Sequence, residues 1–126
     1  MLLVVTASHK TAPFELLERL SRTPDDVAST VVDMASCVQG AVVLATCNRF
    51  EAYVEMDEPV TAAGAIGVEA VLEAVEASTG IRATELDGAY EVHSGRRVAE
   101  HLFSVASGLE SVVSVSYTHL TLPTSD

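Results

Sequence analysis

The stretch AVVLATCNRFEAYVEM, residues 41–56, runs from an apolar segment through polar residues into a second, alternating segment. Residues 41–45 lack polar alternation, which is typical of a strand inside a sheet. Residues 50–56 alternate, which predicts a half-buried strand. Its outward-facing side chains would be Glu51, Tyr53 and Glu55. Because the connection is short, we expect an antiparallel hairpin with residues 47–49 at or beside its tip.

The segments before this hairpin predict one strand and two helices. Residues 2–6 are short, apolar and β-branched, as in a strand. Pro13 can open a helix that runs to Leu20, because the first turn does not need its missing N–H. A second helix is expected from residues 23–26 to Gly40. Its apolar residues at helical spacing are Val27, Val31, Met34 and Val38.

The segments after the hairpin predict a helix, a strand and a last helix. An alanine-rich helix should follow Pro59 and end near Gly80, and residues 90–93 should form a strand. The last helix would follow Gly95, with an apolar stripe of Val98, Leu102, Val105 and Leu109. This order predicts an α+β, ferredoxin-like split βαβ sandwich, with helices on one face of an antiparallel sheet, plus a trailing helix.

Composition limits the function classes. The chain has 126 residues, enough for one domain with its own core, and 48 % of them are hydrophobic. Its net charge of −11 argues against a general nucleic-acid binder. We find neither an apolar run of bilayer length nor a signal peptide pattern, and expect a cytoplasmic protein without membrane contact. Cys37 and Cys47 lack metal-ligand or disulfide spacing, so we expect no metal.

The final segment, SVSYTHLTLPTSD, breaks the pattern of the preceding helix. Its β-branched and aromatic residues lower helix propensity. The string VSYTHL also resembles a translated sequencing-adapter read-through. We therefore expect residues 114–126 to be a non-native tail, and His119 carries no functional weight.

Three blocks in order resemble the N-terminal catalytic domain of glutamyl-tRNA reductase. They are SHKTAP at residues 8–13, ATCNR at 45–49 with Glu51 and Tyr53, and HLF at 101–103 followed by ASGLES at 106–111. The resemblance covers residues 1–113. It departs from the family after Val113, where a substrate-holding Gly-Glu-x-Gln segment would follow.

The resemblance implies a thiol mechanism. The Cys47 thiolate would attack the ester of glutamyl-tRNA, and NADPH would reduce the glutamyl thioester to glutamate-1-semialdehyde, the entry to tetrapyrroles such as haem. A thiol suits this task because it is a stronger nucleophile than a hydroxyl. The NADPH domain and the C-terminal domain of the family homodimer would lie outside this chain. The fragment would then form the thioester or act as an esterase, without reduction.

The same resemblance assigns further site residues, each with an ordinary alternative. Arg49 would grip the substrate carboxylate in bidentate fashion and favour the thiolate; it could instead form a salt bridge with Glu51 or Glu55. Thr46 and Asn48 would contact the glutamyl group, or simply form the turn. Cys47 could be a core residue, as we expect for Cys37.

Two histidines and a serine complete the predicted site. His101 would move a proton during catalysis, or be an ordinary half-buried histidine beside the apolar stripe. His9 would be a substrate-binding residue of the first loop, or merely solvated. Ser111 matches a substrate contact of the family.

Other functions remain open at this point. A ferredoxin-like small-molecule or regulatory module with a structural Cys47 would share this fold. A small cysteine hydrolase lacks support, since no G-x-S-x-G elbow is present. The cations available to tRNA are scattered, so we expect weak, salt-sensitive binding. They are Lys10, Arg19, Arg22, Arg96 and Arg97.

Overall fold

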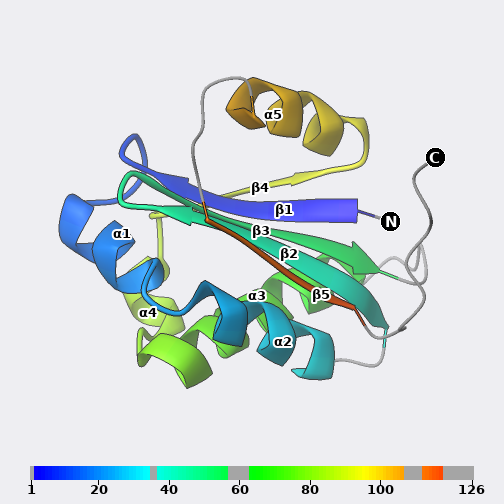
Figure 1. Ribbon diagram of the computed structural model, residues 1–126, viewed down its shortest axis with the longest axis horizontal. Helices are drawn as coiled ribbons and strands as arrows, with labels where there is room; N and C mark the ends of the chain where they lie inside the picture. The colour runs from blue at the N-terminus through cyan, green and yellow to red at the C-terminus, as the bar shows by residue number, and fades with distance from the viewer. Residues whose placement is uncertain (1, 35–36, 57–62, 107–111, 118–126) are drawn as a thin grey trace.

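A computed structural model describes residues 2–34, 37–56, 63–106 and 112–117, which contain a five-stranded antiparallel sheet (Figure 1). The strands are β1 (Leu2–Ser8), β2 (Val38–Thr46), β3 (Arg49–Met56), β4 (Glu91–Ser94) and β5 (Val112–Tyr117). Their order across the sheet is β4-β1-β3-β2-β5. The first four strands have the ferredoxin-like arrangement, which confirms the fold class predicted from the sequence.

Helices lie on both faces of this sheet (Figure 1). They are α1 (Phe14–Leu20), α2 (Pro24–Met34), α3 (Ala63–Thr79), α4 (Ala83–Leu86) and α5 (Arg96–Ala106). The first four share one face, as predicted. The trailing helix α5 lies on the opposite face, above β4 and β1 in the view of Figure 1. None of the helices in the described part of the chain is both long and apolar enough to cross a bilayer.

The main core lies between the sheet and α1–α4. Every second residue of the central strands points into it, including Val5 of β1 and Ala52 of β3. Leu17 of α1 and Val71 of α3 are fully buried against these strands. A second cluster lies under α5 and consists of Val4, Leu44, Tyr53 and Val98, with Val42 at its margin. Both sheet faces of the hairpin are therefore covered.

This double coverage corrects the prediction that β3 is half-buried. The alternation is as expected, but Glu51 is 0 % and Tyr53 is 5 % exposed because α5 packs over their face. Glu55, at the far end of the strand, is exposed. The sequence pattern predicted the alternation of the strand correctly, but it did not reveal that α5 covers the second face.

The start of β2 corrects a second prediction. Helix α2 ends at Met34, and Val38 and Gly40 belong to β2. Val38 pairs with Met56 across an irregularity in the register, so strand pairing and burial outweigh its helical spacing. Cys37 lies in the preceding turn rather than in a helix, although it packs half-buried against the main core as expected.

The last described strand was not predicted. Residues 112–117 pair with β2, with Val43 opposite Ser114, and thus cross the boundary expected at Val113. The β-branched residues that disfavour a helix here favour a strand. Helix α5 ends at Ala106, and Leu109 lies outside the described residues. The non-native origin of residues 114–126 stays a prediction.

Candidate functional site

A polar cleft opens on the α5 face of the sheet, at the end where the β2–β3 hairpin turns. Its volume is about 250 Å³. Its lining residues are Thr6, Ser8, Lys10, Thr11, Arg49, Glu91, His93 and His101. Most of them share a face because the strands are in register: Thr6 is opposite both Glu51 and Glu91, and Ser8 is opposite Arg49. Helix α5 contributes His101.

Glu51 is buried beside this cleft and surrounded by hydrogen-bond donors. Its Oε1 accepts a hydrogen bond from the Tyr53 hydroxyl at 2.7 Å. Its Oε2 accepts from Thr6 Oγ1 at 2.6 Å and from Arg49 Nη1 at 3.0 Å, and also contacts His101 Nε2. A buried carboxylate is tolerated only when its oxygens are satisfied in this way.

These contacts decide the charge of Glu51. Burial alone would raise its pKa, but the hydrogen bonds from Thr6, His101 and Tyr53 outweigh burial and hold the pKa below its usual range. Burial and the neighbouring carboxylate raise the pKa of Tyr53. At neutral pH the pair is therefore a carboxylate that accepts and a phenol that donates.

The hairpin tip presents Cys47. Cys47 and Asn48 form the turn, and both are exposed. The tip is tied down on either side of the thiol: Ser21 Oγ donates to the Thr46 carbonyl at 2.7 Å, and the Asn48 N–H donates to Thr46 Oγ1 at 3.2 Å. Cys47 does not line the cleft, but it precedes the lining residue Arg49 by only two positions. An exposed thiol thus sits on a fixed turn at the cleft's end.

The first loop lies beside this tip, as Figure 1 shows for the neighbouring turns after β1 and β2. The His9 N–H donates to the Asn48 carbonyl oxygen at 3.2 Å. The His9 side chain is exposed, and Lys10 lines the cleft. The first loop and the hairpin tip are therefore in contact, which brings Lys10 and the hairpin to the same end of the cleft.

His101 and Arg49 meet on Glu51, although 52 positions separate them in the chain. The His101 side chain is 21 % exposed, and its ring centroid lies 5.2 Å from that of His93. Arg49 forms an ion pair with Glu51, the salt bridge that the sequence analysis gave as the alternative to substrate binding. Ser111 falls outside the described residues.

Sequence reasoning missed the residues that connect the site. The alternation of β3 predicts a solvent-facing side for Glu51 and Tyr53, and no motif in the sequence assigns a role to Thr6, Glu91 or His93. Two signals could have found them. Glu51 stands between apolar residues in a central strand, and the apolar stripe of the last helix requires a sheet face to cover.

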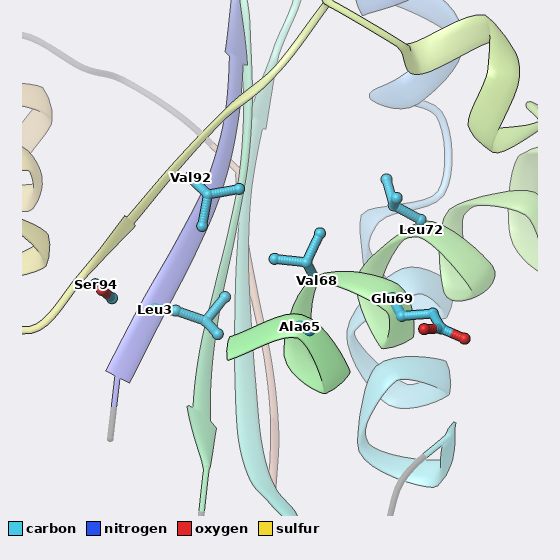
Figure 2. Close-up of a pocket in the computed structure, with 7 residues that line it drawn as sticks. All are labelled: Leu3, Ala65, Val68, Glu69, Leu72, Val92 and Ser94. Carbon is cyan, nitrogen blue, oxygen red and sulfur yellow. The ribbon is translucent and has the colours of Figure 1, made fainter. Parts of the chain in front are cut away.

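A second, larger cavity has fewer polar and ionisable side chains in its walls. It lies between the β1–β4 edge and α3, with a volume of about 490 Å³ (Figure 2). Its walls are mainly aliphatic, and among the described residues Glu69 is the one ionisable side chain that lines it. Within the described residues, no group of three or more His, Cys, Asp or Glu side chains is arranged to hold a metal ion. The polar cleft is therefore the candidate site.

Comparisons with known proteins agree on one family. The model of the family described as "Glutamyl-tRNAGlu reductase, N-terminal domain" matches residues 5–115. A glutamyl-tRNA reductase of Clavibacter michiganensis subsp. michiganensis is 51 % identical over 113 residues, covering 90 % of this chain and 26 % of that protein. One of Frankia casuarinae is 41 % identical over 114 residues, covering 89 % and 23 %. The chain thus spans about a quarter of the length of these relatives.

Proposed function

Because the chain belongs to the glutamyl-tRNA reductase family, we propose that Cys47 accepts the glutamyl group of glutamyl-tRNA as a thioester. This would be the first chemical step in reducing glutamyl-tRNA to glutamate-1-semialdehyde for tetrapyrrole synthesis. The observation that carries the proposal is an exposed thiol on an anchored turn, two residues from a guanidinium in a polar cleft.

The proposed step balances without a cofactor. The Cys47 Sγ–C bond forms at the ester carbonyl, and the bond from that carbon to the ribose oxygen breaks. The thiol proton ends on the released tRNA hydroxyl. His101, half-buried at the cleft, is the group we assign to carry that proton. Without a reductant, water would slowly hydrolyse the thioester to glutamate and the free thiol.

Cations of the cleft would bind the glutamyl carboxylate. Arg49 uses Nη1 for Glu51, and its guanidinium has further N–H groups for a substrate. Lys10 lines the same cleft and adds a second positive charge. Thr46 and Asn48 would contact the glutamyl group from the tip, as would His9 from the first loop. Ser111 is proposed on the family resemblance alone.

The reduction is assigned to NADPH held by a part of the relatives beyond this chain. The present residues do not fit that cofactor: the 126 residues contain no G-x-G-x-x-G sequence, and the cleft of about 250 Å³ is small for a dinucleotide. We derive no step of the reduction from them. Homodimerisation through a C-terminal domain is likewise proposed only for the longer protein.

The test is single-turnover cleavage of radiolabelled glutamyl-tRNA by excess protein. We expect release of tRNA and a protein-bound label that hydroxylamine removes. Cys47→Ser should abolish both signals, and Cys37→Ser, the matched control, should retain them. Cleavage that survives Cys47→Ser would contradict the proposal.

One observation favours a second function, that of a binding module with a non-catalytic Cys47. Arg49 is already paired with Glu51 and need not meet a substrate carboxylate. In that case, glutamyl-tRNA would stay intact with the unmodified chain, and the Cys47→Ser variant would behave identically.

A further inference from the structure

We propose that Glu51 is a positioning residue for the thiol-transfer step: its carboxylate holds Arg49 and His101 at the cleft and fixes which nitrogen of His101 carries a proton. This inference rests on the proposed function, because it concerns the same reaction. It assigns a task to a buried residue that need not touch the substrate.

The geometry of a single oxygen atom is the starting point. Oε2 of Glu51 contacts both Arg49 Nη1 and His101 Nε2, although Arg49 belongs to β3 and His101 to α5. Thr6 Oγ1 donates to the same atom from β1. The carboxylate cannot turn to favour one partner, because the Tyr53 hydroxyl holds its other oxygen at 2.7 Å. Three elements are therefore oriented by one fixed group.

The ionisation of Glu51 determines the proton arrangement of His101. An ionised carboxylate only accepts hydrogen bonds, and the hydrogen bonds to Glu51 hold its pKa low. Nε2 of His101 must therefore bear hydrogen. In the neutral ring, Nδ1 is then the only nitrogen with a free lone pair, and it is the atom left to take a proton in the reaction.

Other charged groups surround the same ring. Lys10 approaches from the first loop, and Glu91 and His93 come from β4, all three lining the cleft with His101. His93 Nε2 lies 3.6 Å from Glu91 Oε1, so Glu91 is directed toward His93. Glu51 is the carboxylate in hydrogen-bond contact with His101, which makes it the group that orients this ring.

Among the described side chains of α5, the two apolar ones nearest His101 differ in burial. Val98 is the buried anchor of α5 in the second cluster, whereas Leu102, the next residue after His101, is 41 % exposed. The Glu51 contact holds the ring at the cleft, and without it the ring could turn about its side-chain bonds. A displacement of about 1 Å can cost on the order of 10²-fold in rate.

A kinetic cycle separates positioning from a purely structural role. We would compare Glu51→Gln with Glu55→Gln, which removes an exposed carboxylate from the same strand. In single-turnover cleavage, Glu51→Gln should lower the maximal rate by about 10²-fold and raise the half-saturation concentration through Arg49. In a His101→Ala background, Glu51→Gln should lower the maximal rate by no more than about threefold, because both changes disable the same Glu51–His101 pair.

Fully additive losses of maximal rate would overturn the proposal, as would an unchanged rate in folded Glu51→Gln. Alkylation of Cys47 should stay at the wild-type rate in the Glu51→Gln variant and in the His101→Ala variant. A parallel loss of alkylation would mean that Glu51 supports the hairpin tip instead.

A measurement on the unmodified chain avoids any folding defect of the variants. In ¹⁵N-labelled protein at about pH 9, where imidazoles are usually neutral, the Nε2 of His101 should show the chemical shift of a protonated nitrogen. A bare Nε2 would overturn the positioning role while Cys47-dependent cleavage persists. Conversely, cleavage of glutamyl-tRNA that persists in the Cys47→Ser variant would refute the proposed function. It would also refute the positioning role, whatever the nitrogen spectrum shows.

Discussion

The main-chain N–H of His9 donates a hydrogen bond to the carbonyl oxygen of Asn48 at 3.2 Å, and this joins the first loop to the β2–β3 turn. Ser21 holds the other side of the turn through the Thr46 carbonyl. Cys47 lies between these two anchored residues and is nevertheless exposed. Its backbone is thus fixed while its sulfur stays open to reagents, a combination that suits a nucleophile better than a packing residue.

Cys47 should react with iodoacetamide faster than Cys37. Cys37 is half-buried against the main core, so a reagent must wait for local opening, whereas Cys47 is open in the folded chain. We expect a rate ratio of about tenfold or more, measured by peptide mass spectrometry at neutral pH. The ratio should fall toward one in guanidinium chloride. Equal rates in the folded chain would mean that the turn does not present its thiol as described.

The threonine-to-valine change should have opposite consequences at Thr6 and Thr23, whose side-chain oxygens differ in their partners. Thr6 Oγ1 donates to the Glu51 carboxylate at 2.6 Å, so Thr6→Val leaves a buried charge with one donor fewer and should cost about 1–3 kcal/mol. Thr23 Oγ1 is buried and finds no partner among the described residues, so Thr23→Val should be neutral or stabilising. Urea unfolding of both variants measures the difference. A larger loss at Thr23 would contradict the assigned network.

Glu51 should make the chain more stable at neutral than at acidic pH. Its pKa is lowered in the folded state relative to the ordinary value of 4.5, so the unfolded chain binds the proton first as pH falls. The stabilisation is present above about pH 4.5 and is lost as pH falls through the lower folded-state pKa. The free energy of unfolding should therefore decline below pH 4.5 more steeply in the wild type than in Glu51→Gln.

The control for this slope is Glu73→Gln, which removes an exposed carboxylate from α3. That variant should keep the wild-type steepness. If Glu51→Gln also kept it, the hydrogen bonds to Glu51 would not favour its ionised form in the folded chain.

The sequence was most informative where one local pattern dominated. Alternation in residues 50–56 predicted β3, and the short polar connection predicted a turn carrying Cys47. It failed where a distant element decided the outcome. Glu51 looked like a solvent-facing residue because nothing near it in sequence reveals that His101, 50 positions later, packs over it. Val38 followed a helical spacing but joined β2, since pairing with Met56 outweighed local propensity.

Gly67 should be intolerant of a larger side chain, because it lets α3 approach the sheet closely. A Cβ at this position would lie 2.6 Å from Leu3 Cδ2, closer than packed atoms allow, and a tight 3.2 Å from Met56 Sδ. Alanine normally stabilises a helix interior by about 0.5–1 kcal/mol relative to glycine. Here the overlap with fully buried Leu3 should reverse the sign, and Gly67→Ala should lose about 1–3 kcal/mol.

A double-mutant cycle with Leu3→Ala tests the physical cause of that loss. If the overlap with Leu3 is responsible, Gly67→Ala should be neutral or stabilising once Leu3 is shortened, which gives a coupling energy of about 1–3 kcal/mol between the two positions. Urea unfolding of the four proteins provides the numbers. Additive losses would show that the overlap with Leu3 is not the cause and would leave the 3.2 Å contact with Met56 Sδ as its source.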